Sequence, residues 1–126
     1  MRFTIVGLVA VLLVAALGYL HMVADPVTIV ADPDEDLCSG FAVAKGAPGS
    51  PSSLMSRPIF LAREIAKITP GTGLLLCDRS GDWLGVVVLV EGVECIDRTD
   101  RRVPRNYLGP CQSGWLRSED LELFAG

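Results

Sequence analysis

The chain has 126 residues and a formal net charge of -4 at pH 7. This length accommodates one domain and a targeting segment but not two independent cores. The acidic balance argues against a general nucleic-acid-binding protein. Half of the residues are apolar, and part of that share comes from one N-terminal run. We therefore expect a single small domain that binds no nucleic acid.

Residues 1–24 have the pattern of an export signal. Arg2 is followed by an apolar run at 3–20, and acidic residues follow that run. A cation before an apolar stretch is typical of a signal peptide or signal anchor, and it places the rest of the chain outside the cytoplasm. Small residues at Ala16 and Gly18 suit cleavage, whereas the length of the run suits retention in the inner membrane. Both alternatives stay open, and the chain is expected to be periplasmic or anchored.

Residues 25–37 are predicted to form a solvated acidic spacer between the export segment and the domain. The stretch contains no Lys or Arg. A run of like charges without counter-charges is usually solvated. The acidic residues are Asp25, Asp32, Asp34, Glu35 and Asp36.

The domain is expected to span 38–124 and to be all-β. Its first strand is predicted at 41–44, where the residue pattern alternates. A loop rich in Gly, Pro and Ser follows at 45–53. The stretch 58–68 is ambiguous, because its apolar residues fit both a helical spacing and short extended pieces. The sequence Thr-Pro-Gly-Thr at 69–72 predicts a turn.

The central part of the domain has a clearer hairpin pattern. Residues 73–77 and 82–90 are rich in β-forming apolar side chains, and the polar bend 78–81 separates them. The remaining elements are, in order, a polar excursion at 91–110, a strand at 114–117, a 3₁₀-like turn at 118–120 and a closing segment at 121–124.

Several motifs in this pattern resemble the bacterial SH3-like domains. They are PGT at 70–72, LLLC at 74–77, GDWLGVV at 81–87 and GWL at 114–116 with its following turn, and more weakly VAKGAPGS at 43–50. The run YLGPCQSGW at 107–115 is similar to exported, cysteine-containing members of that family. The resemblance covers about 38–124. It implies a small barrel of about five strands that acts as a non-catalytic binding module of the cell envelope.

The four cysteines are Cys38, Cys77, Cys95 and Cys111, and outside the cytoplasm we expect them to form disulfides. Three connectivities are possible. We favour Cys95–Cys111, which closes the base of the polar excursion, and Cys38–Cys77, which ties the incoming chain to the hairpin. Each bridge would stabilise the fold by roughly 3–4 kcal/mol on loop-entropy grounds. No closely spaced Cys or His pair points to zinc, so we expect neither a metal nor a cofactor; redox-active or free thiols are the less favoured alternatives.

The polar excursion holds the first candidate binding residues, which are Arg98, Arg101, Arg102 and Arg105. Guanidinium groups bind carboxylates and phosphates, so this loop is a candidate for contact with peptidoglycan, lipid head groups or an envelope protein. The alternative is a solvated loop with internal Arg–Asp pairs.

Two aromatic residues are further candidates. Trp83 and Tyr107 are candidate contacts for an extended peptide. A tyrosine at the base of a loop also often hydrogen-bonds to backbone, and Trp115 is expected in the core.

No catalytic apparatus is recognisable in the sequence. The only histidine, His21, lies in the export segment, so a Cys or Ser nucleophile would have no histidine base in the mature region. The carboxylates Asp78, Asp82, Glu119 and Asp120 are interpreted as solvated or capping groups. We expect a non-enzymatic module that recognises an extended or wall-derived peptide or a partner protein. The alternative is a structural or inhibitory envelope protein that docks on one partner through its arginine-rich loop.

Overall fold

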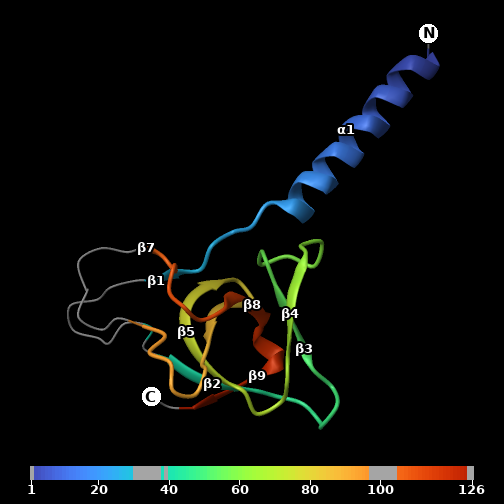
Figure 1. The fold of residues 1–126 in the computed structure, drawn as a ribbon. Helices are drawn as coiled ribbons and strands as arrows, with labels where there is room; N and C mark the ends of the chain where they lie inside the picture. Colours follow the sequence, from blue (N-terminus) through green and yellow to red (C-terminus); the bar gives the residue numbers. More distant parts are fainter. Residues whose placement is uncertain (1, 30–37, 39, 97–104, 125–126) are drawn as a thin grey trace.

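The computed structural model describes residues 2–29, 38, 40–96 and 105–124. It consists of an N-terminal helix, α1 (Arg2–Met22), and a domain of β-strands (Figure 1). Helix α1 extends away from this domain, and its described apolar side chains are largely exposed. Within these described ranges, no helix is long and apolar enough to cross a membrane.

One curled antiparallel sheet forms the domain, with the strand order β4-β3-β8-β6-β5-β2-β9 (Figure 1). A two-stranded ribbon of β1 and β7 lies beside it. A single 3₁₀ turn, η1 (Ser118–Asp120), connects β8 to β9. The strands are β1 (Thr28–Ile29), β2 (Gly40–Ala44), β3 (Ser52–Met55), β4 (Glu64–Ile68), β5 (Gly73–Ser80), β6 (Trp83–Val88), β7 (Arg105–Asn106), β8 (Ser113–Arg117) and β9 (Leu121–Phe124). The all-β prediction is confirmed.

The sheet has more strands than the expected number of about five. The additional hairpin, β3–β4, arises where a loop and an ambiguous stretch were predicted, and residues 58–68 contain turns and a strand but no helix. The central hairpin is confirmed, although β5 continues through Ser80 and the connection is a tight turn at Gly81. Gly81 adopts a φ of 58°, which glycine reaches without steric cost, and this conformation permits the tight turn.

The central strands are apolar on both faces because both faces of the sheet are covered. Along β6, Leu84 and Val86 belong to one core, whereas Trp83 and Val87 belong to the other. The first core is formed by the sheet itself. The second core lies on the other face of the sheet. It includes Val27 and Ile29, and also Ile96 and Tyr107, which lie between Cys95 and Cys111 in the sequence. This two-sided coverage explains the continuous apolar run in β6.

Residues 25–29 are part of the domain, so the predicted solvated spacer is wrong for this segment. Val27 and Ile29 are 1% and 4% exposed and help to cover the second face of the sheet. The indole Nε1 of Trp115 donates a hydrogen bond to the backbone oxygen of Asp25 at 2.8 Å. The apolar side chains within this acidic stretch therefore determine its position. The rest of the predicted spacer lies outside the described residues.

Both favoured disulfides are present. Cys38 is bonded to Cys77 with a Cα–Cα distance of 4.2 Å, and Cys95 to Cys111 with a Cα–Cα distance of 5.3 Å. All four cysteines are buried in the core that covers the second face of the sheet. Because disulfides persist in oxidising compartments, these two bridges indicate an environment outside the cytoplasm.

Candidate functional site

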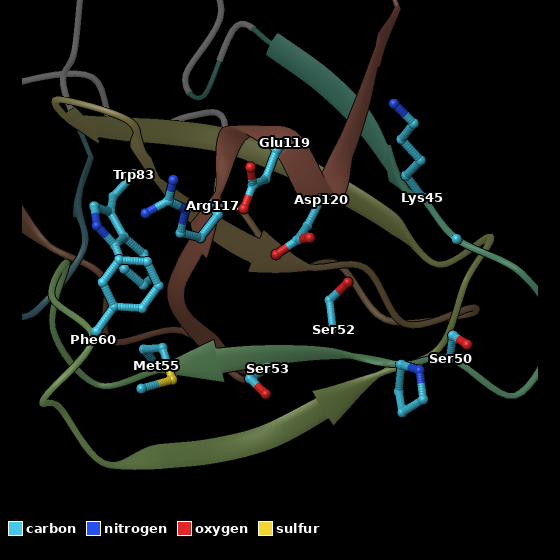
Figure 2. Close-up of a pocket in the computed structure, with 12 residues that line it drawn as sticks. Lys45, Ser50, Ser52, Ser53, Met55, Phe60, Trp83, Arg117, Glu119 and Asp120 are labelled. Carbon is cyan, nitrogen blue, oxygen red and sulfur yellow. Dashed lines mark ion pairs between the residues drawn. The ribbon is translucent and has the colours of Figure 1, made fainter.

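A groove with a cavity volume of about 550 Å³ opens between the β3–β4 hairpin and η1, and we call it the β3–η1 groove (Figure 2). Strand β3 forms one wall with Ser52, Ser53 and Met55. The other wall comes from the end of β8 and from η1. The groove is therefore bounded by two segments that are far apart in the sequence.

The groove exists because β3 and β8 diverge. Strand β8 pairs with β6 along its whole length, but it pairs with β3 only at Trp115, opposite Met55. At this closed end the strands approach so closely that a Cβ atom on Gly114 would lie 2.7 Å from the Leu54 Cγ atom. The absence of a side chain at Gly114 thus permits the contact from which the two strands separate.

Aromatic side chains and one arginine form one end of the groove. Phe60 meets Trp83 edge-to-face, with ring centroids 5.4 Å apart and an interplanar angle of 70°. The Arg117 Cζ atom lies 4.6 Å from the Phe60 ring centroid and 5.6 Å from that of Trp83. Such contacts hold a guanidinium by cation–π attraction. Trp83 is buried and forms the floor, whereas Phe60 is 71% exposed at the rim.

The wall formed by η1 carries two carboxylates, Glu119 and Asp120, and we call it the acidic wall. The Arg117 guanidinium compensates part of its negative charge. Its Nε atom lies 3.4 Å from the Glu119 Oε1 atom, which is an ion-pair distance. The same Nε has no hydrogen-bond partner among the described residues, so the pair is close in space but not aligned for a hydrogen bond. Since the Glu119 side chain is 69% exposed, the contact contributes little stability.

Asp120 and Ser52 lie on opposite walls in the middle of the groove (Figure 2). Partial burial raises the pKa of Asp120 above its ordinary value, and repulsion from Glu119 adds to this, while Arg117 acts in the opposite direction. Ser52 is only 9% exposed. Lys45 lines the far end, but its ammonium group points away from Asp120 in Figure 2.

Of the predicted site residues, Trp83 lies in the groove and Tyr107 does not. Tyr107 is buried, and its hydroxyl donates a hydrogen bond to the Cys95 backbone oxygen and accepts one from the Cys111 backbone N–H. It therefore has the backbone-bonding role that was one of its two expected roles. Arg105 contributes backbone to β7. Arg98, Arg101 and Arg102 lie outside the described residues.

The four carboxylates occupy different surroundings. Asp78 accepts hydrogen bonds from the backbone N–H groups of Thr28 and Arg79, at 3.0 and 2.8 Å, which agrees with its interpretation as a capping group. Asp82 is exposed. Glu119 is exposed, as expected for a solvated group, and Asp120 is half-buried; both also line the groove.

Sequence reasoning missed the other groove residues. Phe60 lies in the stretch 58–68, whose periodicity was ambiguous. Ser52 lies in the stretch 45–53, which was predicted to be a loop. One available signal was that Phe60 is the single aromatic residue of the stretch 58–68. The sequence Arg-Ser-Glu-Asp at 117–120, which places two acidic residues close to an arginine, was a second signal.

The groove has the features of a binding site for an extended ligand. Its lining combines two aromatic rings, the Arg117 guanidinium held against them, one lysine, two carboxylates and three serines. In the described part of the chain, no cluster of three or more His, Cys, Asp or Glu residues is placed to hold a metal ion. No family model, curated protein or solved structure matches this chain.

Proposed function

We propose that the chain is an exported, non-catalytic SH3-like module whose β3–η1 groove binds an extended peptide. The observation that carries the proposal is the groove itself, a cleft of about 550 Å³ with the buried Trp83 and the exposed Phe60 at one end. Peptide-binding surfaces of small β-domains use aromatic side chains in this way, because they offer apolar area together with a polar edge.

The topology supports the SH3-like part of the proposal. The GDW motif begins β6 after a tight turn from β5, and the GWL motif lies in β8 directly before η1. These are the elements that the resemblance implies for each motif. The seven-stranded sheet is larger than the implied barrel because the β3–β4 hairpin is added to it.

Two features support export. Residues 1–24 combine an N-terminal cation with an apolar helix, and both disulfides lie in the domain that follows. N-terminal sequencing of the protein recovered from the producing cells tests this part. A chain that starts downstream of the apolar run supports cleavage, and a cytoplasmic, reduced chain contradicts export.

The binding experiment is co-sedimentation of the exported protein with purified peptidoglycan, run beside titration of Trp fluorescence with soluble wall peptides and with extended peptides of unrelated sequence. We expect binding that Phe60→Ala weakens at least fivefold. The matched control is Leu108→Ala, which truncates a side chain that is 92% exposed and lies outside the groove. Binding that neither variant changes, or that both change equally, contradicts a role for the groove.

The two peptide sources give different results in this experiment. Sedimentation together with titration by wall peptides identifies a wall ligand. Titration by protein-derived peptides alone identifies an envelope protein as the source. No titration by any peptide contradicts the proposed function.

A further inference from the structure

Two polar groups in the β3–η1 groove face each other without a partner. Figure 2 shows the Ser52 hydroxyl and the Asp120 carboxylate directed into the space between the two walls. No hydrogen bond or ion pair from any described residue reaches either group. The Ser52 residue as a whole is only 9% exposed, so the groove is the side from which a ligand can reach its hydroxyl. Both groups can accept a hydrogen bond from a donor that enters the groove.

The two cationic side chains that line the groove, Arg117 and Lys45, do not pair with Asp120. The Arg117 guanidinium lies against Phe60 and Trp83 and forms its ion pair with Glu119. The Lys45 ammonium is directed away from the acidic wall. The Asp120 carboxylate is therefore left without an ion-pair partner among the described residues. Its pKa is raised by partial burial first and by repulsion from Glu119 second, so a ligand cation beside it would compensate a charge that the groove disfavours.

Ser53 provides an internal comparison on the same strand. Its hydroxyl accepts a hydrogen bond from Lys67 Nζ at 3.3 Å, and Figure 2 shows it pointing away from Asp120. Lys67 is in turn paired with Glu64 at 2.8 Å. The serine on the outer side of β3 is thus satisfied within the hairpin, whereas Ser52 is not.

We propose that the β3–η1 groove selects peptides that carry a primary ammonium group, which is held between Ser52 and Asp120 while its carbon chain lies along Trp83 and Phe60. This inference rests on the proposed peptide-binding function. An ammonium group offers three donors and a positive charge. It can donate to the Asp120 carboxylate and to the Ser52 hydroxyl at the same time, and Glu119 adds a second negative charge beside it.

Other ligand chemistries fit this part of the groove less well. A carboxylate placed there would meet two like charges, Glu119 and Asp120. A neutral amide N–H would satisfy only one of the two groups and would not compensate the charge of Asp120. An apolar side chain would displace water from both groups and offer neither of them a hydrogen-bond partner.

The test compares blocked pentapeptides that differ only at the central side chain, which is lysine, Nε-acetyllysine or glutamate. Each is titrated into the oxidised, exported protein, and binding is followed by amide chemical shifts and Trp fluorescence. We expect the lysine peptide to bind at least tenfold more tightly than the acetylated peptide, because acetylation removes the charge that strengthens both hydrogen bonds. The glutamate peptide should bind most weakly.

Variants locate the ammonium in the groove. Asp120→Asn should weaken binding of the lysine peptide about tenfold and Ser52→Ala several-fold, without changing binding of the acetylated peptide. The matched controls are Glu122→Gln, on the exposed side of β9, and Ser80→Ala, at the exposed end of β5 and outside the groove. Amide spectra of the free variants verify that each one is folded.

The possible outcomes separate this inference from the proposed function. Equal binding of the lysine and acetylated peptides, weakened by Phe60→Ala, retains the peptide groove and overturns the ammonium site. Binding of wall or protein peptides with no response to the lysine peptide at millimolar concentration also overturns it. Absence of binding to every peptide overturns both proposals.

Discussion

The Tyr107 hydroxyl donates a hydrogen bond to the Cys95 backbone oxygen at 2.7 Å, across the base of the loop that the Cys95–Cys111 bridge closes. The same hydroxyl accepts a hydrogen bond from the Cys111 backbone N–H at 3.1 Å. One buried side chain therefore connects the backbone at both ends of the bridge. The disulfide and the tyrosine act on the same pair of chain segments.

Replacing this hydroxyl should destabilise the domain. Tyr107→Phe leaves the Cys95 carbonyl and the Cys111 N–H buried without this partner, and we expect a loss of about 1–3 kcal/mol of unfolding free energy. Urea denaturation of the oxidised protein measures it. The control is Tyr19→Phe, in the exposed part of α1, which should change the value by less than about 0.5 kcal/mol. Equal stability of the two variants would contradict the structural role of Tyr107.

The two disulfides should contribute unequally to stability. Their sequence separations are 39 for Cys38–Cys77 and 16 for Cys95–Cys111. Because loop entropy grows with the logarithm of loop length, the longer loop should contribute about 0.8 kcal/mol more to unfolding free energy. Double alanine replacement of each pair, followed by denaturant titration, compares them. Removal of either bridge should lower Tm markedly, and melting that is unchanged by a reducing thiol would refute stabilisation by the bridges.

The segment 25–29 should behave as core. Val27→Ala removes two methyl groups from a side chain that is 1% exposed, and we expect a cost of about 2 kcal/mol. The matched control is Val90→Ala, which makes the same change at a side chain that is 50% exposed and should cost less than about 0.5 kcal/mol. Thermal melts of both variants test the difference. Equal melting temperatures of the Val27→Ala and Val90→Ala variants would contradict a core role for residues 25–29.

The partly buried Asp120 should make stability depend on pH. The pKa of its carboxyl is raised in the folded protein by desolvation first and by Glu119 second, while Arg117 opposes both. The ammonium group of Lys45, which follows β2, points away from Asp120 (Figure 2). The folded state therefore binds the proton more tightly than the unfolded chain. The contribution of Asp120 to stability is unfavourable above its folded pKa and disappears below its ordinary value of 3.8.

The variant Asp120→Asn isolates this contribution. Because the group is largely open to solvent, we expect the variant to be more stable than the parent at pH 7 by less than about 1 kcal/mol. The difference should vanish near pH 3. Urea titrations at both pH values, with Glu122→Gln as the control, measure it. A variant that is less stable than the parent at pH 7 would show that the carboxylate makes a stabilising contact.

The elements that the sequence predicted correctly depend on local signals. The β5–β6 hairpin could be located because a glycine that reaches positive φ separates two runs of β-forming residues. The turn η1 follows from its short polar composition between two strands. The cysteine pairing was inferred because one bridge closes an evident excursion and the other ties the incoming chain to that hairpin.

The elements that were missed depend on contacts between distant residues. Val27 and Ile29 are only two apolar side chains in an acidic stretch, and their burial requires the outer face of a sheet formed later in the chain. Strand β3 begins in a Ser- and Pro-rich segment and is defined by its pairing with β4. The groove needs the divergence of β3 from β8, and no local pattern encodes it.

Only Val23 and Ala24 lie between the end of α1 and Asp25, whose backbone N–H donates to the Ser56 carbonyl at 2.9 Å. Proteases generally require several residues in an extended conformation on each side of the bond that they cut. Once Asp25 is tethered, two residues do not provide that length. If the proposed export segment is cleaved at this connection, the cut must precede folding of the domain, and a later cut must lie upstream within the helix.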